Sequence, residues 1–405
     1  MLSQVIYYLK RPFHFVKTGL LQGLRAQIQT RFPEKKLRII AITGTDGKTS
    51  STTLLHHILL STKRKSGLVS TVGFFMGKKP NDSGLHVTAP QPNDLYAFMQ
   101  QLVEKKYEFL VLETTSHGLY QFRTWGIHPE IAAITNIARE HLDYHGTYKK
   151  YLEAKALLLH DAAKVILNAD DQSYSLLHSL AAKKEVQTFS ASERLPPGVN
   201  TAITARFAEA YNQQNARMVF KICLELGISK QEFIGALPTF QHAPGRMQWL
   251  PLNKPFKVLI DFAHTPQGIS AVLTSLKKQQ AAKKNPGRVL VVFGCAGLRD
   301  REKRPIMGKI ATHIADLAIF TAEDPRTEDV WSIIRQMKEQ LTDHHDKVVS
   351  IPDRKEAIRF ALNTARAGDY VAILGKGHEQ SMSYGTEEIP WNDTQVTTEL
   401  AQDRI

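Results

Sequence analysis

Two blocks of the chain alternate short apolar runs with stretches of helical character, and this alternation constrains the fold more than any other feature. In the first block the runs are LRIIAIT, EFLVLETT, EIAAITNI and AKVILNAD, rich in β-branched residues. The second block carries FKVLIDFA, RVLVVFGC, LAIFTAED and DYVAILGKG. Strands that are apolar along their whole length and are separated by helices are typical of parallel sheets covered on both faces. The sequence therefore predicts an α/β protein with two mostly parallel sheets.

The stretch TFQHAPGRMQW lies between the two blocks, and its Pro244-Gly245 pair predicts a hinge. We therefore expect one domain over residues 37–243 and a second over residues 244–405. We also expect a surface loop over residues 190–203.

Residues 1–36 form a separate basic section with seven Lys/Arg and one acid, Glu34. The net charge of the whole chain is +13, and about +7 remains when this section is left out. Apolar residues recur at every fourth position in it: Val16, Leu20, Leu24 and Ile28. This pattern predicts a basic amphipathic helical segment.

Composition narrows the class of protein. The two cysteines, Cys223 and Cys295, are too few for a disulfide framework, so a reducing, cytoplasmic setting is expected. No apolar run approaches the roughly 20 residues of a membrane span, and a secretory signal is not recognisable. Basic runs interleaved with aromatic residues are missing after residue 36, which argues against nucleic acid as a partner. We expect a monomer that acts on small molecules.

The motif GTDGKTS follows the first apolar run and precedes a helical pattern, an arrangement that can cradle a phosphate. Glycine lets backbone N–H groups approach phosphate oxygens, Lys48 supplies a cation, and the hydroxyl of Thr49 can reach Mg²⁺. Ile42 stands where the standard pattern has its first glycine, so a plain strand-turn-helix remains an alternative. The candidate nucleotide-binding residues here are Gly44, Thr45, Asp46, Gly47, Lys48, Thr49 and Ser50.

Two further polar residues follow predicted strands, Glu113 after EFLVLE and His141 after EIAAITNI. The carboxyl ends of parallel strands meet at one edge of a sheet, where open α/β folds bind ligands. Mg²⁺ prefers oxygen ligands, so Glu113 and Thr49 are candidates to hold it. Taken singly, a surface acid and a solvated or helix-capping histidine are the simpler interpretations.

Ten motifs occur in an order that resembles the Mur ligases, and within them the UDP-N-acetylmuramoyl-tripeptide synthetases. They are GTDGKTS, ETTSHGLYQFR, TNIAREHLDYHGTYKKYLEAKALL, NADD, YNQQNA, PGRMQ, DFAHTPQG, FGCAGLRDREKRPIMG, EDPRTED and GKGHE. The resemblance covers about residues 37–395. It implies a P-loop-type ATPase domain followed by a Rossmann-like C-terminal domain.

The resemblance also implies a reaction. Mur ligases transfer the γ-phosphoryl group of ATP to a substrate carboxylate, and an amine then attacks the acyl phosphate. Lys48 would hold the β- and γ-phosphates, and Thr49 and Glu113 would hold one Mg²⁺. His141 would bind a second Mg²⁺ together with Lys155, which matches the lysine that is carbamylated in the family. ATP and two Mg²⁺ ions are thus the implied cofactors.

The resemblance assigns further residues to each substrate. Nucleotide-contacting positions are matched by Asn168, Asn212, Asn215, Arg246 and Asp261. The muramoyl-peptide acceptor would be gripped by Thr88, Thr115, Gln121 and Arg123. The amino-acid pocket would contain Arg299, Glu323, Asp324, Arg326, Gly375 and Glu379.

The amino-acid pocket departs from the family pattern at two positions. Ligases for diaminopimelate carry Asp-Asn-Pro-Arg, and this chain has Glu323-Asp324-Pro325-Arg326. A planar guanidinium suits the second carboxylate that distinguishes diaminopimelate from lysine. The retained Arg326 therefore favours meso-diaminopimelate.

Only about 36 residues precede the phosphate loop's strand, whereas tripeptide synthetases of this family carry a UDP-binding domain there. We therefore expect either that the UDP moiety is held differently or that the acceptor is not a UDP-sugar, for example a lipid-linked precursor. Residues 1–36 would contact the inner face of a membrane, hold a pyrophosphate-linked acceptor, or pack on the ATPase domain. Ligases similar to folylpolyglutamate or cyanophycin synthetases, and a non-catalytic nucleotide-binding scaffold, are the alternative functions.

Overall fold

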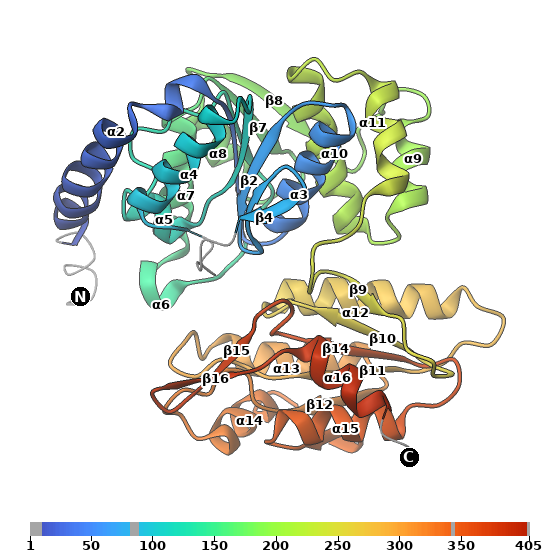
Figure 1. Ribbon diagram of the computed structural model, residues 1–405. Coiled ribbons are helices and arrows are strands. Elements are labelled where there is room, and N and C mark those ends of the chain that lie inside the picture. Colours follow the sequence, from blue (N-terminus) through green and yellow to red (C-terminus); the bar gives the residue numbers. More distant parts are fainter. Residues whose placement is uncertain (1–9, 82–88, 342–344, 403–405) are drawn as a thin grey trace. The chain divides into compact units, whose positions relative to one another are not determined.

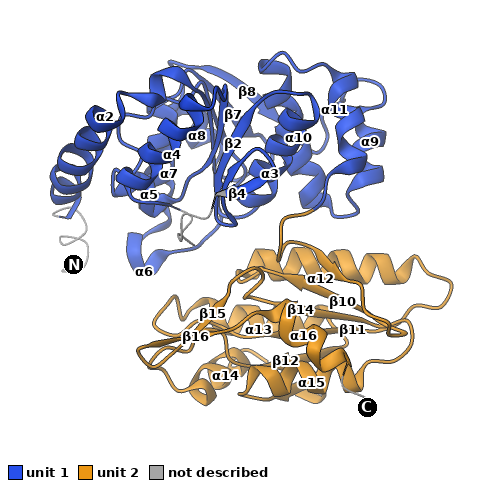
Figure 2. Ribbon diagram, in the orientation of Figure 1, with its two compact units in different colours: residues 1–241 blue, residues 242–405 orange. Residues whose placement is uncertain are grey.

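The computed structural model describes residues 10–81, 89–341 and 345–402. The chain divides into two compact units, residues 1–241 and 242–405 (Figure 2). The boundary between the two units lies after Gln241, two residues before the Pro244-Gly245 pair at which the sequence indicates a hinge.

Unit 1 is built on one eight-stranded sheet of strand order β4-β3-β2-β5-β1-β6-β7-β8 (Figure 1). The six strands from β2 to β8 in this order are parallel, while β3 and β4 add an antiparallel edge. The strands are β1 (Arg38–Thr43), β2 (Ser66–Ser70), β3 (Gly73–Met76), β4 (Lys79–Asn81), β5 (Phe109–Glu113), β6 (Ile131–Ile134), β7 (Lys164–Asn168) and β8 (Glu185–Phe189).

Helices connect these strands and cover both faces of the sheet. They are η1 (Phe15–Leu24), α2 (Arg25–Thr30), η2 (Pro33–Lys36), α3 (Lys48–Ser61), α4 (Pro92–Glu104), α5 (Ser116–Tyr120), α6 (Leu142–His145), α7 (Tyr148–Asp161), α8 (Tyr174–Leu180), α9 (Val199–Arg206), α10 (Ala210–Glu225), α11 (Lys230–Ala236) and η3 (Leu237–Thr239). The helical N-terminal segment packs against α4 as part of unit 1.

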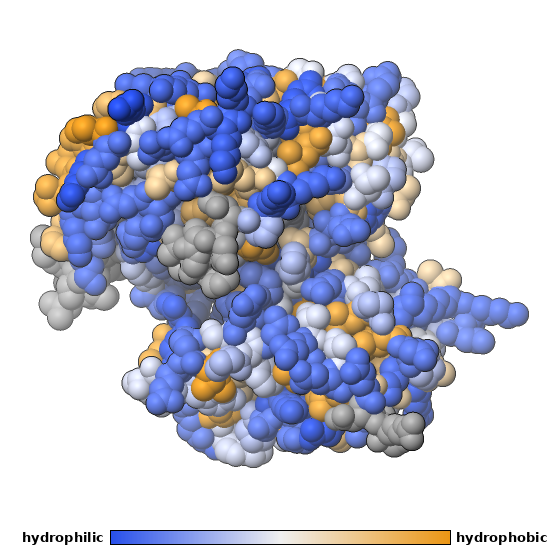
Figure 3. Space-filling model, in the orientation of Figure 1, coloured by the Kyte–Doolittle hydropathy of each residue, from blue (hydrophilic) through white to orange (hydrophobic). Residues whose placement is uncertain are grey.

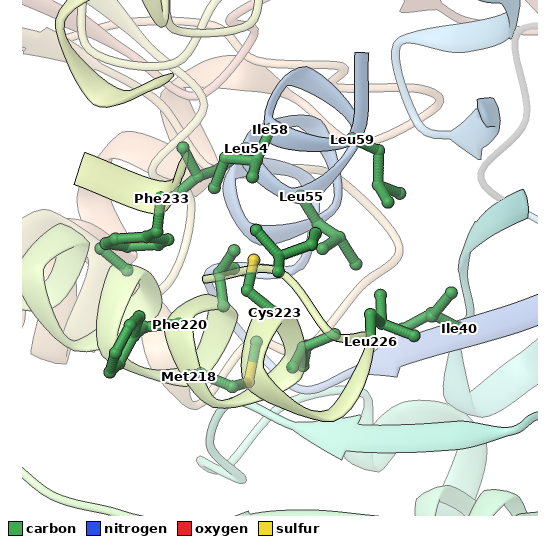
Figure 4. Close-up of a cluster of buried hydrophobic side chains, with 14 of the residues drawn as sticks. Ile40, Leu54, Leu55, Ile58, Leu59, Met218, Phe220, Cys223, Leu226 and Phe233 are labelled. Atoms are coloured by element: carbon green, nitrogen blue, oxygen red, sulfur yellow. The ribbon is translucent and has the colours of Figure 1, made fainter. Parts of the chain in front are cut away.

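Successive side chains of β1 point to opposite faces of the sheet, and both faces are buried, which explains why this strand is apolar throughout. Ile40 and Ile42 face a core formed with α3, α10 and α11, and Figure 4 shows Leu55 and Cys223 in that core. Ile39 and Ala41 face a second core on the opposite side of the sheet, with α4 and α7. A strand with a core on each face has no polar side, as the sequence pattern predicts.

Unit 2 contains a six-stranded sheet of order β13-β12-β11-β14-β10-β9 and a separate hairpin of β15 and β16. In the six-stranded sheet all pairs of described strands are parallel except the edge pair of β9 with β10, and the hairpin of β15 and β16 is antiparallel. The strands are β9 (Gln248–Leu250), β10 (Lys257–Asp261), β11 (Val289–Phe293), β12 (Leu317–Phe320), β13 (Val348–Ser350), β14 (Tyr370–Leu374), β15 (Ser381–Tyr384) and β16 (Glu387–Pro390). The helices are α12 (Pro266–Ala281), α13 (Lys303–Ile314), α14 (Val330–Lys338), η4 (His345–Lys347), α15 (Arg354–Thr364) and α16 (Asp393–Gln402).

A buried ion pair ties unit 2 together at the ends of its strands. Arg354 and Asp393 lie 2.7 Å apart, and both side chains are fully buried. The same guanidinium donates to the carbonyls of Ala322 and Leu374, so each charge is hydrogen-bonded. A buried pair is tolerated only when its charged groups are hydrogen-bonded, and here every nitrogen of the guanidinium donates a hydrogen bond.

The predicted fold class is confirmed, since both sheets are mixed but mostly parallel and all eight apolar runs form strands. The predicted loop over residues 190–203 is wrong over its last five residues. Helix α9 begins at Val199, and Val199 and Ile203 are buried in the core beside α11. Tertiary packing stabilises this short helix, because its own sequence has no amphipathic pattern.

Candidate active site

The phosphate-loop motif connects β1 to α3 and depends on two glycines for close packing. A Cβ on Gly44 would lie 1.8 Å from Thr135 Oγ1, and one on Gly47 would lie 2.5 Å from Asn215 Oδ1. Gly47 also has a left-handed backbone with φ of 81°. Any side chain here would displace the loop, so both positions require glycine.

The loop is held from the β6 side by backbone and side-chain hydrogen bonds. Asn136 accepts from Thr45 N–H through its carbonyl and from Asp46 N–H through Oδ1, at 2.9 and 3.0 Å. Lys48 is the first residue of α3, and its Nζ donates to Thr45 O at 2.7 Å. The ammonium group thus lies over the loop and beside the positive end of a helix, where an anion would be stabilised. Ser50 lies in the first turn of α3, where its carbonyl accepts from the hydroxyl of Thr53.

Glu113 is the last residue of β5, and its buried carboxylate is oriented by two threonines. Thr49 Oγ1 lies 3.1 Å from both Glu113 oxygens. Thr71 donates to the same carboxylate from its N–H at 3.0 Å and from its hydroxyl at 2.9 Å. The sequence predicted Thr49 and Glu113 at one site, and the structure brings them into direct contact.

Lys155 is fully buried in α7 and reaches the phosphate loop. Its Nζ donates to Gly44 O at 2.6 Å and lies 4.6 Å from the centroid of the Tyr151 ring. Burial, and then the charge of Lys48, holds the pKa of Lys155 well below its usual value, while nearby carboxylates such as Glu113 oppose this. A neutral amine is therefore favoured more strongly here than at an exposed lysine.

His141 lies on the same side of the phosphate loop as Lys155. It has a left-handed φ of 55° immediately before α6, and its ring lies 6.0 Å from that of Tyr151. The hydroxyl of Tyr151 is 3.0 Å from Thr45 Oγ1 in the loop. Lys48, Glu113, His141 and Lys155 are thus all carried by elements that surround one loop.

Residues that sequence reasoning missed complete this site. His117 lies 4.9 Å from His141 by ring centroids, and His145 is buried with its Nε2 3.0 Å from Ser116 Oγ. Burial lowers the pKa of His145 to about 3, so this imidazole is neutral. The His-x-x-x-His spacing of 141 and 145 is visible in the sequence, whereas Thr71 has no sequence signal.

The three predicted asparagines lie near the loop on neighbouring elements. Asn168 ends β7 and donates to Thr135 O at 2.9 Å. Asn215 in α10 contacts Gly47 and donates to Asn212 Oδ1 at 3.3 Å. In the described part of the chain, His, Cys, Asp and Glu side chains form no group of three that could hold a metal ion.

The predicted acceptor residues that the structure describes lie around α5. Thr115 caps this helix by accepting from Gly118 N–H at 3.0 Å. Arg123 Nε donates to Gln121 Oε1 at 3.0 Å, and Gln121 donates to Tyr144 OH at 3.0 Å. Thr88, the fourth predicted residue, lies outside the described residues.

In unit 2, Arg246 and Asp261 lie close to each other at the carboxyl end of β10. Asp261 accepts from the N–H groups of Met247 and Ala263, at 2.7 and 2.8 Å. The guanidinium of Arg246 stacks 4.3 Å from the Phe262 ring centroid. Their contact with a nucleotide remains a prediction.

The predicted amino-acid residues of unit 2 gather at the ends of β12 and β14. Lys376 lies 2.7 Å from Asp324 and 2.5 Å from Glu379. A Cβ on Gly375 would lie 2.4 Å from Glu323 Oε2, so this carboxylate needs glycine beside it. Burial raises the pKa of Glu323 to about 7.

The remaining predicted residues of this group are two arginines. Arg326 has a left-handed φ of 52°, and its Nη1 donates to Gly297 O at 2.6 Å. Arg299 is exposed on the loop after β11. Both acidic and basic groups thus lie around the ends of β12 and β14, as recognition of a zwitterionic amino acid would require.

Comparison of the sequence with known protein families identifies both units of the chain. Residues 42–232 match the family "Mur ligase middle domain", and residues 245–377 match "Mur ligase, glutamate ligase domain". The UDP-N-acetylmuramoyl-L-alanyl-D-glutamate–2,6-diaminopimelate ligase of Geobacillus kaustophilus is 33% identical over 401 residues, covering 92% of this chain and 80% of the relative. The corresponding ligase of Geobacillus thermodenitrificans is 34% identical over 399 residues, with the same coverage.

Solved structures lead to the same family. A UDP-N-acetylmuramoyl-L-alanyl-D-glutamate–2,6-diaminopimelate ligase superposes with a TM-score of 0.60 at 28% identity, over 94% of this chain and 82% of the other. Folylpolyglutamate synthase of Mycobacterium tuberculosis shares the fold, with a TM-score of 0.67 at 15% identity over 92% of this chain and 96% of the other. With its phosphate loop and two characteristic domains, the chain belongs to the Mur ligase family of ATP-dependent amide-bond ligases.

Proposed function

We propose that this ligase joins meso-diaminopimelate to the D-glutamate carboxylate of a muramoyl-dipeptide during peptidoglycan synthesis. The gathering of Lys48, the Thr49–Glu113 pair and Lys155 around Gly44 carries the proposal, because phosphoryl transfer needs cationic groups and oriented oxygens at one place. The relatives at 33 and 34% identity are 2,6-diaminopimelate ligases, which supports this choice of substrates.

The first step makes the acceptor carboxylate reactive. A carboxylate oxygen attacks the γ-phosphorus of ATP, and the bond to the β–γ bridging oxygen breaks, so that ADP leaves and an acyl phosphate forms. Both reactants are anions, so the reaction requires positioning and neutralisation of charge. Lys48 and the N-terminus of α3 supply positive charge beside the loop.

The second step forms the amide. The free amine of the amino acid attacks the acyl carbon, the bond from that carbon to the phosphate oxygen breaks, and inorganic phosphate leaves. The nitrogen releases its extra proton to solvent. Thr115, Gln121 and Arg123 would hold the acceptor during both steps, with the hydrogen bond between Gln121 and Arg123 fixing their side chains.

Magnesium fits the donor set at this site. Glu113 offers a buried carboxylate whose orientation is fixed by Thr71, and Thr49 adds a hydroxyl beside it. A carbamate on Lys155, formed when its neutral amine adds to CO₂ and loses a proton, would be a second anionic ligand, with His141 nearby. Bound Mg²⁺ would neutralise charge on the transferred phosphoryl group.

The choice of amino acid rests on Arg326. Among the described hydrogen bonds its guanidinium uses one donor, to Gly297, which leaves N–H groups for a substrate carboxylate. Glu379 would meet the distal ammonium group. Lysine lacks the second carboxylate and would leave Arg326 without this partner.

Phosphate release tests the proposal with ATP, Mg²⁺ and either UDP-linked or lipid-linked muramoyl-dipeptide. We expect release with one of these acceptors and a higher kcat/KM for diaminopimelate than for lysine. Arg326→Met should lower kcat/KM for diaminopimelate by about 100-fold, because it removes a charge-assisted contact of about 3 kcal/mol. Arg335→Met, at an exposed arginine of the same unit, is the matched control.

A preference for lysine, or an equal effect of the two arginine variants, would contradict the proposed amino acid. Absence of phosphate release with every acceptor would contradict the proposed reaction.

A further inference from the structure

The N-terminal helix of unit 1 packs with its small and polar residues inward. Its buried residues are Thr18, Gly19, Gly23, Ala26 and Gln27. A Cβ on Gly19 would lie 3.4 Å from Phe122, and one on Gly23 would lie 3.4 Å from Trp125. The glycines therefore allow η1 to approach the loop after α5 closely.

Hydrogen bonds hold this orientation of the helix. Gln27 Nε2 lies 2.8 Å from Tyr96 OH and 3.3 Å from Trp125 O. Tyr96 also donates to Trp125 O at 2.8 Å. The polar face of the helix is thus specifically attached to α4 and to the loop after α5.

The opposite face of the helix carries large apolar side chains exposed to solvent. Their exposed fractions are 59% for Phe13, 50% for Val16, 65% for Leu21, 37% for Leu24 and 58% for Ile28. We call these five residues the apolar face. Figure 3 shows hydrophobic residues along the edge of unit 1 where Figure 1 draws η1 and α2.

This orientation is the reverse of that in an ordinary surface helix, which buries its apolar stripe and exposes its polar one. The alternative orientation was available to a sequence with this periodicity, and the hydrogen bonds of Gln27 oppose it. A contiguous exposed apolar patch marks a contact with another molecule or a membrane.

Exposed basic residues occur along the same segment as the apolar face, and Lys17 Nζ lies 5.7 Å from the centroid of the Phe13 ring. These basic residues are Lys10, Lys17 and Arg25 on the helix, Arg31 directly after its end, and then Lys35 and Lys36. Glu34, the only acid of residues 10–36, is buried. A helix with an apolar face bordered by basic residues lies in the interface of an anionic bilayer, with its cations at the headgroups.

The same charge argues against a second copy of this chain as the partner. The protein carries a net charge of +13, so two copies of this basic surface would repel each other. We propose that the apolar face docks on a bilayer that contains anionic phospholipid. The docked segment lies against the loop of Gln121 and Arg123, so it would bring that part of the ligase to the membrane.

Vesicle co-sedimentation of the full chain tests the proposal. We expect binding to vesicles of phosphatidylcholine with 30% phosphatidylglycerol, and at least tenfold weaker binding to phosphatidylcholine alone. Binding should fall when salt rises from 0.05 to 0.5 M, because the electrostatic part is screened. Leu21→Ser/Ile28→Ser should weaken binding at least tenfold, whereas Leu176→Ser/Leu224→Ser, at other exposed leucines of unit 1, should not.

The same co-sedimentation assay tests the contribution of charge. Lys17→Gln/Arg25→Gln should weaken binding to anionic vesicles, whereas the control Lys278→Gln/Lys284→Gln, at exposed lysines of unit 2, should not. A cooperative thermal unfolding transition serves as the check that each variant is folded. Equal vesicle binding by Leu21→Ser/Ile28→Ser and Leu176→Ser/Leu224→Ser overturns the proposal, as does absence of binding to anionic vesicles. A dimer in sedimentation velocity that Leu21→Ser/Ile28→Ser abolishes, without vesicle binding, would assign the face to a second copy and also overturn it.

Discussion

Lys48 is the residue whose single charge matters most to the proposed chemistry. Its Nζ lies 2.7 Å from Thr45 O, so the ammonium is held over the loop before any nucleotide arrives. A preorganised cation needs little rearrangement as charge develops on the transferred phosphoryl group, which makes its contribution large.

Lys48→Met should therefore lower kcat for phosphate release by at least about 100-fold, since one preorganised donor to developing charge is worth about 3 kcal/mol. The chain should remain folded, with its thermal midpoint within about 3 °C of the unchanged protein. Lys36→Met, at an exposed lysine before β1, controls for loss of charge alone. Retained turnover in Lys48→Met would show that the loop does not serve phosphoryl transfer.

Glu323 is a residue whose burial should be visible in the pH dependence of stability. Its folded-state pKa is raised to about 7 by burial, above the value of 4.5 that it has when exposed. The folded chain therefore keeps a proton that the unfolded chain has lost between these values. Stability from this group is present at low pH and is lost as pH rises through about 7.

The glutamine side chain of the variant Glu323→Gln cannot ionise, so the variant should not lose this stability as pH rises. We expect the variant to gain about 3 kcal/mol of unfolding free energy relative to the unchanged protein between pH 4 and pH 8. Denaturant unfolding at the two pH values measures this difference. Glu339→Gln, at an exposed glutamate, should show no such change, and a parallel pH dependence in both variants would be the contrary result.

At the scale of elements, the docking of the N-terminal helix depends on Gly126. This glycine has a left-handed φ of 83°, and a Cβ on it would lie 1.7 Å from Gln27 Nε2. Gly126→Ala should displace the Gln27 amide from Tyr96 and Trp125 and loosen the helix. We expect tryptic cleavage within residues 10–31 to become several-fold faster, as followed by mass spectrometry.

Gly227→Ala separates this displacement from backbone strain. Gly227 also has a left-handed backbone, with φ of 72°, but nothing lies within 4 Å of an added Cβ. Both variants place an alanine in a left-handed backbone conformation, but only the added methyl group of Gly126→Ala clashes with a side chain, that of Gln27. If cleavage of the helix speeds up equally in both, the contact with Gln27 does not hold it.

The elements that sequence predicted well are those whose pattern is local. The eight apolar runs form strands because burial on both faces makes each run apolar in itself. Strand β2 contains only Leu68 and Val69 as large apolar residues, so its position depends on pairing with β5, which is distant in sequence. Thr71 follows β2, and its contact with Glu113 was therefore invisible without the sheet order.

The same distinction applies to the N-terminal segment. Its periodicity predicted an amphipathic helix, and the described part is helical. Which face is buried depends on Gln27 and on two glycines that fit against Phe122 and Trp125. Those contacts join residues about a hundred positions apart, so periodicity alone could not reveal the reversed orientation.

At the scale of the whole molecule, the proposed reaction divides between the two units. Unit 1 contains the phosphate loop with Lys48, Glu113 and Lys155, and unit 2 contains the acidic and basic residues around Lys376. Nucleotide binding through unit 1 and completion of the reaction should therefore respond separately to changes in unit 2.

Gly245, at the start of unit 2, allows this separation to be tested. Its φ is 65°, and a Cβ on it would lie 2.1 Å from the backbone nitrogen of His378 and 2.3 Å from the carbonyl carbon of Gly377. Backbone atoms cannot swing aside as a side chain can, so Gly245→Ala should shift the loop that carries Lys376 and Glu379.

We expect Gly245→Ala to lower the rate of complete turnover by at least tenfold, because a misplaced binding group loses orientation as well as contact. The dissociation constant of ADP, measured by calorimetry, should change much less than turnover does, because the phosphate loop belongs to unit 1 and only the predicted contacts of Arg246 and Asp261 belong to unit 2. Gly368→Ala is the matched control, with a left-handed φ of 88° and nothing within 4 Å of its Cβ. Normal turnover in Gly245→Ala would show that the loop after β14 tolerates displacement, and equal losses of turnover and ADP affinity would show that the two units do not divide the work.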